Sequence, residues 1–360
     1  MKVQSFPEYI AEHIVNKTTI VVTGSHGKTT TTAMIMYVLK EMHVDFDYLV
    51  GGLIDGFERM VRLSPTSKSA VVEGDEYLSS RLDDRPKMLH YKGDIIIITG
   101  VAWDHMNVFP TYENYLSQFR RLCSELSDDG RVFYDKTDVD LTTLIHEAAL
   151  KSNSFGYGPL DNKGRTIDYQ GALYPISVFG QHNRSNMHAA LLACQEVGVS
   201  ASEFLKAIAQ FKGVDKRLMQ VNDHPIVYRD FAHAPSKVKA TVSAIRETYT
   251  EDQVLAVLEL HTYSSLSKSF IPLYHSSLDD ADIAIVFFDP KVIEQKRLSP
   301  ILPLDIHSSF NHPNLIVVTD KGELIDQIIK NKKSIDVFLL MSSGNLGGVN
   351  VLELIKKASD

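Results

Sequence analysis

Cysteine is scarce in this sequence, because only Cys123 and Cys194 occur among 360 residues and neither has metal-type spacing. Two cysteines cannot supply the disulfide framework of a small secreted protein, and a structural zinc site needs more ligands at closer spacing. A disulfide scaffold and a structural zinc site are therefore excluded. We expect two reduced, buried thiols.

Long apolar runs and basic clusters are also lacking. No stretch reaches the roughly 18 apolar residues of a membrane span, and residues 1–17 contain no apolar core of the signal-peptide type. The formal net charge is -8, the pI is near 6.0, and no long run of Lys and Arg occurs, whereas nucleic-acid binding needs a basic surface. We expect a cytoplasmic protein with no membrane span and no nucleic-acid partner.

The sequence does have the composition of a globular enzyme. Its hydrophobic fraction of 44% and charged fraction of 23% allow a sizeable core, and its length predicts two domains, or three. Short β-branched runs alternate with helical patterns, which is typical of a mainly parallel sheet with crossover helices. The predicted fold class is α/β, with a break between two series near residue 220. The expected strands are 18–23, 70–72 and 95–99, then 226–228, 254–258, 283–288, 315–318 and 337–341.

Helical patterns occupy the gaps between these strands. Residues 28–42 form the first one, directly after the first strand. A later pattern at 321–330 places four apolar residues on one face, namely Leu324, Ile325, Ile328 and Ile329. Between about 130 and 180 the pattern becomes short and glycine-punctuated, which predicts a small β-rich excursion rather than another α/β unit.

The strongest chemical signal is the run VVTGSHGKTT at 21–30, where a strand enters a glycine loop that opens a helix. Glycines let backbone N–H groups converge on an anion, and the helix N-terminus adds partial positive charge. Lys28 can reach the outer phosphates of a nucleotide, and the Thr29 hydroxyl can ligate magnesium. The general P-loop pattern has a further glycine where Val22 stands, so this loop is the shorter TGxxGKT form. We expect Lys28 to lie on a solvent-accessible loop.

Acidic and amide residues also occur at the ends of other predicted strands and at the start of a predicted helix. Glu73 stands in the run VEGDE at a strand's carboxyl end, where open α/β sheets place their ligand crevice, and such a carboxylate can hold Mg²⁺ or simply be a solvated acid. His105, in the run TGVAWDH, can bind a second metal or merely be hydrogen-bonded at the surface. Asn183 and Asn186, in GQHNRSN, can present amides to a nucleotide, although their spacing alone indicates only a helix cap.

Taken together, these residues resemble the Mur ligases of peptidoglycan synthesis, with folylpolyglutamate synthase as a more distant relative. The ordered motifs span nearly the whole chain: TGSHGKTT at 23–30, EGDE at 73–76, DH at 104–105, HNRSN at 182–186, KR at 216–217 and RDFAHAP at 229–235. Six motifs in the right order are far more specific than any one of them. The resemblance implies a central ATP-binding domain at 1–219, of P-loop type, and a C-terminal Rossmann-like domain at 220–360.

The resemblance also implies roles for individual residues. Lys28 would hold phosphate, Thr29 and Glu73 would ligate Mg²⁺, and His105 would serve the second metal. Arg217 would reach the γ-phosphate region, and His233 would lie near the substrate carboxyl. The remaining nucleotide-binding positions would be Gly24, Gly27, Thr30, Asn183, Asn186 and, at the ribose, Asp230.

Within the family, the runs GDEYLSS, AWDHMNVFPTYENY and ELHTYSSL are most similar to the murein peptide ligase and UDP-N-acetylmuramate:L-alanine ligase branch. Several other members carry a carbamylated lysine after the DH motif, whereas residues 106–119 hold no lysine, which also favours this branch. Mur ligases normally begin with a UDP-binding domain of glycine-fingerprint type. Here Met1 falls just before the central domain, so we expect that domain to be supplied upstream or absent, and this chain to bind Mg-ATP but ligate poorly.

The implied reaction joins UDP-N-acetylmuramate to L-alanine or to a murein tripeptide. ATP first phosphorylates the lactyl carboxylate, with catalysis by positioning and charge neutralisation, and the amine then attacks the acyl phosphate. The C-terminal domain would bring in the amine and exclude water. Two alternatives remain open: a nucleotide-binding module without ligase activity that acts through a partner, and a folate-type or other amide ligase with a different acceptor.

Overall fold

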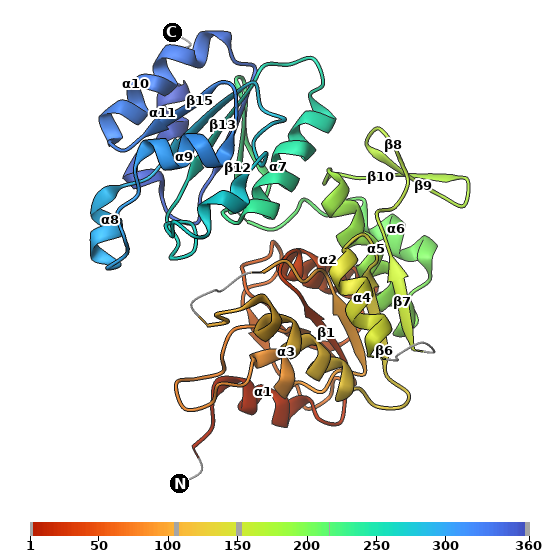
Figure 1. The fold of residues 1–360 in the computed structure, drawn as a ribbon. Coiled ribbons are helices and arrows are strands. Elements are labelled where there is room, and N and C mark those ends of the chain that lie inside the picture. Colours follow the sequence, from red (N-terminus) through yellow and green to blue (C-terminus); the bar gives the residue numbers. More distant parts are fainter. Residues whose placement is uncertain (1–2, 104–107, 149–152, 216, 357–360) are drawn as a thin grey trace. The chain divides into compact units, whose positions relative to one another are not determined.

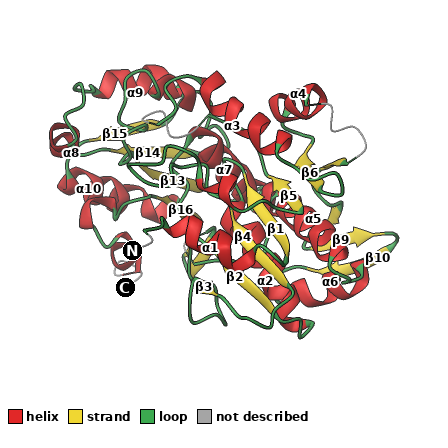
Figure 2. Ribbon diagram, turned by 90° about the horizontal axis from the view of Figure 1, so that it is seen from below, coloured by secondary structure: helices red, strands yellow, loops and turns green. Residues whose placement is uncertain are grey.

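The chain divides into two compact units, Met1–Asp215 and Lys216–Asp360, each built around its own sheet (Figure 1). The computed structural model describes residues 3–103, 108–148, 153–215 and 217–356. In both units the strands lie between helices, so each unit has the layered α/β arrangement that the sequence predicted (Figure 2). The expected α/β fold class with mainly parallel sheets is confirmed. The division falls between Asp215 and Lys216, whereas the sequence placed it near 220.

The first unit contains a seven-stranded sheet in the order β3-β2-β4-β1-β5-β6-β7. All neighbours pair in parallel except β3, which runs antiparallel to β2 at the edge. Because β1 lies between β4 and β5, the carboxyl ends of these three strands meet at one edge of the sheet. The strands are β1 (Thr18–Thr23), β2 (Phe46–Leu49), β3 (Val61–Arg62), β4 (Ser69–Glu73), β5 (Ile95–Ile98), β6 (Arg131–Asp135) and β7 (Ser154–Tyr157).

Helices cover both faces of this sheet. They are α1 (Phe6–Ile14), α2 (Lys28–Glu41), the 3-10 turn η1 (Lys87–His90), α3 (Tyr112–Ser124), α4 (Val139–Glu147), α5 (Gln181–Glu196) and α6 (Ala201–Ile208). One core joins α2, α5 and α6 to the sheet face that carries Val22 and Ile97. A second joins α3 and α4 to the opposite face, which carries Ile96 and Ile98. Alternate residues of a strand point to opposite faces, so an apolar run such as Ile95–Ile98 serves both cores.

The β-rich excursion expected between 130 and 180 is shorter than predicted. β6, α4 and β7 continue the parallel sheet, so the α/β pattern extends to Tyr157, and the expectation was wrong for this stretch. Only the next segment forms a separate three-stranded antiparallel sheet, with β8 (Asn162–Lys163), β9 (Thr166–Tyr169) and β10 (Ala172–Pro175). The short strand β7 has two exposed residues, which hid the buried-strand signal.

The second unit holds a six-stranded sheet in the order β11-β12-β16-β13-β14-β15, parallel except for the edge strand β11. Its strands are β11 (Met219–Asp223), β12 (Ile226–Asp230), β13 (Val254–Glu259), β14 (Ile283–Phe287), β15 (Leu315–Val318) and β16 (Val337–Met341). Its helices are α7 (Pro235–Thr248), η2 (Ile271–Tyr274), α8 (Pro290–Gln295), α9 (Pro303–Phe310), α10 (Lys321–Asn331), η3 (Lys332–Ser334), η4 (Leu346–Gly348) and α11 (Val351–Lys356). All five strands expected here are present, and β11 was missed.

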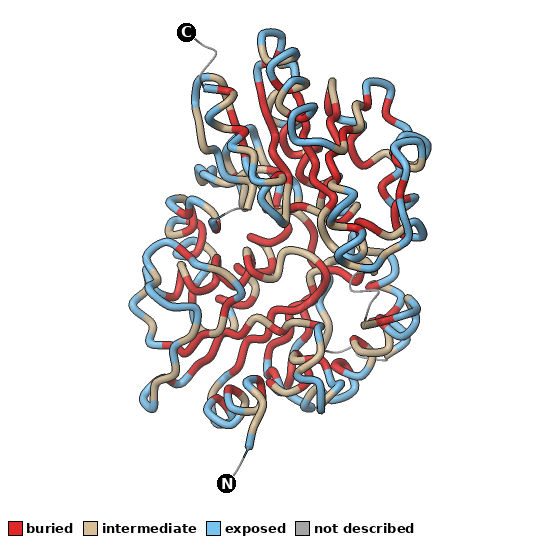
Figure 3. The backbone as a smooth tube through the Cα atoms, turned by 90° about the vertical axis from the view of Figure 1, so that its left-hand side faces the viewer, coloured by how far each residue is buried: buried red, intermediate tan, exposed pale blue. Residues whose placement is uncertain are grey.

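Burial follows the central strands of each unit (Figure 3). Cys123 and Cys194 are both free and buried, as expected from the sequence. On α10, Leu324 and Ile328 are buried, whereas Ile329 is exposed, so the predicted apolar face is narrower than four residues. Among the described residues, no helix is both long and apolar enough to cross a membrane.

Candidate active site

The loop between β1 and α2 is built around two glycines at positions where any side chain would be strained. Gly24 has φ +118°, and a Cβ there would lie 2.6 Å from Thr99 Oγ1. Gly27 has φ +70°, and a Cβ there would lie 2.2 Å from Asn186 Oδ1. Both the left-handed backbone and the close approach of neighbours therefore require glycine. The loop is held against the end of β5, since Ser25 N–H donates to Gly100 O over 2.9 Å.

Helix α2 begins at this loop with its first N–H groups uncapped by any side chain. Gly27 is the N-cap residue, no side-chain cap hydrogen bond forms, and no acidic residue stands in the first turn. By contrast, α1 is closed by a capping box between Ser5 and Glu8. The N-terminus of a 14-residue helix that follows a glycine loop is suited to an anion such as a phosphate.

Lys28 is not on a solvent-accessible loop, so that expectation was wrong. Its side chain is 13% exposed, and its ammonium donates to Gly24 O and to Glu76 Oε2, both over 2.6 Å. The carboxylate of Glu76 is fully buried. Burial favours the neutral amine, but the nearby carboxylates of Glu76 and Asp75 outweigh it, and the pKa of Lys28 is raised. The lysine is therefore charged and held at the loop.

Thr29 and Glu73 bring two oxygen donors together at the same edge of the sheet. Thr29 Oγ1 donates to Glu73 Oε1 over 2.8 Å, and Gly51 N–H donates to Glu73 Oε2 over 2.7 Å. Burial raises the pKa of Glu73, although the Gly51 amide and the charge of Lys28 oppose this. A hydroxyl beside a carboxylate is a hard-oxygen donor set of the kind that Mg²⁺ prefers.

The end of β5 contributes Thr99, whose hydroxyl donates to His26 O within the phosphate loop. Gly100 and Val101 follow, and Val101 N–H donates to Asp138 Oδ2 over 2.8 Å. The expected second-metal residue, His105, lies outside the described residues, as does Asp104.

Helix α5 places both predicted asparagines in buried positions. Asn186 lies against Gly27 of the glycine loop, since a Cβ added at Gly27 would fall 2.2 Å from Asn186 Oδ1. Asn183 Nδ2 donates over 2.8 Å to Phe179 O, which directly precedes the N-cap residue Gly180. This bond ties the first turn of α5 to the segment before it, and a contact of Asn183 with a nucleotide stays a prediction. Thr30, the last residue of the loop motif, lies in the first turn of α2.

The second unit brings together its own three predicted residues. Arg217 stacks on the ring of Phe231 with 4.7 Å to the ring centroid, and His233 meets the same ring edge-on at 5.3 Å. Asp230 Oδ1 accepts from Ala232 N–H over 2.5 Å. Burial raises the pKa of Asp230 to about 6, against the opposing effects of the Ala232 amide and the Arg217 charge.

Two site residues escaped the sequence prediction. Glu76 appeared only as one acid among several in the VEGDE run, and nothing in the spacing marks it as the partner of Lys28. Gly51 follows an apolar segment with no motif, yet its amide holds Glu73 and a Cβ there would lie 2.9 Å from Glu73 Oε1. Both contacts join segments that are far apart in the chain.

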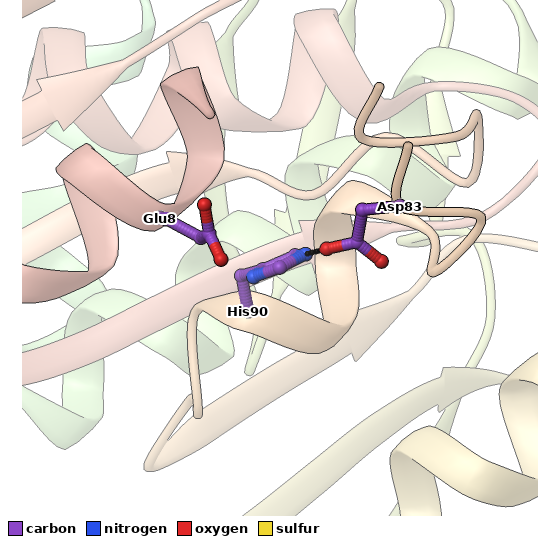
Figure 4. A group of neighbouring side chains, drawn as sticks. All are labelled: Glu8, Asp83 and His90. Atoms are coloured by element: carbon purple, nitrogen blue, oxygen red, sulfur yellow. Dashed lines mark ion pairs between the residues drawn. The ribbon is translucent and has the colours of Figure 1, made fainter. Parts of the chain in front are cut away.

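A different group of side chains has the composition of a metal site. Glu8, Asp83 and His90 offer ligand atoms within 4.8 Å of one another, as Figure 4 shows. However, Asp83 is already paired with Arg85 over 2.7 Å, and Glu8 belongs to the capping box of α1. Arg85 thus already supplies the positive charge for this cluster. The cluster joins α1 to the segment before β5.

Comparisons with known proteins match both units. The family described as Mur ligase middle domain matches residues 22–194, and the family described as Mur ligase, glutamate ligase domain matches residues 216–344. The UDP-N-acetylmuramate--L-alanyl-gamma-D-glutamyl-meso-2,6-diaminoheptandioate ligase of Haemophilus influenzae is 26% identical, over 99% of this chain and 81% of that protein. The UDP-N-acetylmuramate--L-alanine ligase of Porphyromonas gingivalis is 27% identical, over 94% of this chain and 75% of that protein.

Solved structures of such ligases share the fold. A murein peptide ligase from Psychrobacter arcticus matches with a TM-score of 0.65 and 20% identity, over 99% of this chain and 81% of that chain. The UDP-N-acetylmuramate-alanine ligase of Thermotoga maritima matches with a TM-score of 0.68 and 19% identity, over 98% and 78%. A folylpolyglutamate synthase of Mycobacterium tuberculosis matches with a TM-score of 0.69 and 11% identity, over 97% and 93%. The fold alone therefore does not distinguish these activities.

Proposed function

The chain belongs to the Mur ligase family of ATP-dependent amide-bond ligases, and from this membership we propose that it joins UDP-N-acetylmuramate to L-alanine or to a murein tripeptide. The observation that carries the proposal is the meeting of the phosphate loop, the Lys28 ammonium and the Thr29–Glu73 oxygen pair at one sheet edge. The substrate class is taken from the names of the Haemophilus influenzae and Porphyromonas gingivalis ligases described above.

The residues of the first unit would hold the nucleotide. The uncapped N–H groups of α2 and the ammonium of Lys28 would neutralise phosphate charge, which is where phosphoryl transfer gains most. Thr29 and Glu73 would hold Mg²⁺, which when bound would neutralise further charge on the transferring group. Asn186 would keep the loop in place through its contact with Gly27.

The residues of the second unit would serve the reaction from their own cluster. Arg217 carries the positive charge suited to the γ-phosphate region, Asp230 suits a ribose hydroxyl, and His233 suits the substrate carboxyl. Once the carboxylate is phosphorylated, the amine attacks the acyl carbon, phosphate leaves, and an amide bond forms. Exclusion of water protects the acyl phosphate from hydrolysis in the meantime.

The test is amide formation by the whole chain. We would incubate it with Mg-ATP, UDP-N-acetylmuramate and either L-alanine or L-alanyl-γ-D-glutamyl-meso-diaminopimelate, and follow product by mass spectrometry and ADP by a coupled assay. We expect slow formation of an amide product, with an equal amount of ADP, for one of the two amines. Mg-ATP binding without product from either amine would overturn the proposed substrates and favour the nucleotide-binding module.

A further inference from the structure

The ion pair between Lys28 and Glu76 has the geometry of a fixed support for the lysine. Two of the three ammonium N–H groups are taken, one by Gly24 O and one by Glu76 Oε2, each at 2.6 Å. Among the described residues Lys28 has no third partner. The ammonium is thus anchored by a loop carbonyl on β1's end and by a carboxylate that follows β4, with one N–H left for a ligand.

The carboxylate of Glu76 is poorly suited to release the lysine, because its side chain has no solvent exposure. A buried carboxylate that lost its pairing with Lys28 would lose a strong attraction in the protein interior, which is unfavourable. Keeping the pair while the third N–H turns to phosphate avoids that cost. Once phosphate is bound, its own negative charge also balances the lysine, so the position of the ammonium matters more than the charge of its support.

We propose that Glu76 is a positioning residue, which holds the Lys28 ammonium at the phosphate loop so that its remaining N–H group is directed at a nucleotide phosphate. The inference rests on the proposed nucleotide site. Pre-placed donors stabilise phosphate without having to reorganise when it binds. In the alternative, Glu76 would act on Lys28 only through its negative charge, and the exact position of its carboxylate would not matter.

Two conservative substitutions distinguish the effect of the position of the Glu76 acceptor from the effect of its negative charge. Glu76→Gln keeps the length of the side chain and an oxygen acceptor but removes the charge. Glu76→Asp keeps the charge but shortens the side chain by one methylene, which draws the acceptor away from Lys28. We expect the Kd for Mg-ATP, measured by calorimetry, to stay within about twofold of the wild-type value in Glu76→Gln and to rise about fivefold or more in Glu76→Asp.

Asp75→Asn is the matched control. It removes one negative charge at the neighbouring position, where Asp75 pairs with Lys87 over 2.8 Å and makes no bond to Lys28. We expect a Kd within about twofold of wild type for this variant. Thermal melts of all variants check that they fold, and both Glu76 substitutions are close enough in size for folding to be retained.

A second measurement asks whether Glu76 acts through Lys28. In a Lys28→Ala background, Glu76→Asp should change the Kd by less than about twofold, because the group that it positions is gone. A wild-type Kd in Glu76→Asp with a raised Kd in Glu76→Gln would overturn the proposal in favour of a charge effect. An equal rise of the Kd in Glu76→Asp, with Lys28 present and in the Lys28→Ala background, would also overturn the proposal. Failure of the wild-type chain to bind Mg-ATP would instead remove the proposed function, and this inference with it.

Discussion

Thr29 Oγ1 donates a hydrogen bond to Glu73 Oε1 over 2.8 Å, which joins the first turn of α2 to the end of β4. The contact depends on the sheet order, because β4 pairs with β1 in parallel and Val22 is the register partner of Glu73. The second carboxylate oxygen is held by the Gly51 amide. A hydroxyl and a carboxylate that are fixed in this way need little reorganisation to accept a divalent cation.

Glu73→Gln should therefore weaken the response to magnesium. The amide cannot supply the negative charge that Mg²⁺ requires, so we expect the magnesium concentration for half-maximal nucleotide binding to rise at least about tenfold. Magnesium titrations of nucleotide binding measure this. Because burial raises the pKa of Glu73, loss of its charge should not lower the melting temperature. Superimposed titrations for wild type and variant would make Glu73 a structural acid.

Lys28→Ala should weaken Mg-ATP binding strongly and also destabilise the first unit. The substitution removes Lys28 from its ion pair with the buried carboxylate of Glu76, and breaking a buried pair typically costs about 3–5 kcal/mol. Adding Glu76→Gln removes that charge, so the double variant should recover much of the lost melting temperature but not the lost affinity for Mg-ATP. Calorimetry beside thermal melts tests both statements. Unchanged affinity in Lys28→Ala would contradict the assignment of the phosphate loop.

Gly27→Ala should distort the phosphate loop. Its Cβ would meet Asn186 Oδ1 at 2.2 Å, and the left-handed φ of +70° adds strain, so we expect loss of Mg-ATP binding and about 1–3 kcal/mol of destabilisation. Gly198→Ala is the control, since Gly198 has φ +92° but no neighbour within 4 Å of the added Cβ. Calorimetry on this control should show unchanged affinity. An equal loss of binding in both variants would argue against a specific role for the Gly27 contact.

Asp230→Asn should change how the stability of the second unit depends on pH. The pKa of Asp230 is raised to about 6, so the folded unit holds a proton between about pH 4 and 6 that the unfolded chain has released. The corresponding stability is fully present below pH 4 and is lost as the pH rises through 6, by up to about 3 kcal/mol. The melting temperature of Asp230→Asn relative to wild type should therefore increase from pH 4 to pH 7. A pH-independent difference would contradict the raised pKa.

The secondary structure was largely predictable because it depends on local patterns. The β-branched run of β1, the glycines of the phosphate loop and the helical start at Lys28 are neighbours in the chain, so their order alone indicates a strand-loop-helix unit. The same reasoning failed for β7, whose exposed residues carry no periodic signal, and for the edge strand β11. Edge strands bury little, and their pattern is correspondingly weak.

The sequence by itself determined the α/β class, the glycine loop between β1 and α2, and the family, since all three follow from residue order and motif spacing. Only the tertiary structure decided that Lys28 is paired with the buried Glu76, that Asn186 packs on Gly27, and that the Gly51 amide holds Glu73. These contacts join residues from 22 to 159 positions apart, and they exist because the sheet order places β4 and β5 on either side of β1 while α5 packs against α2. Spacing along the chain carries no trace of such neighbours, because they meet only after the crossover helices have packed.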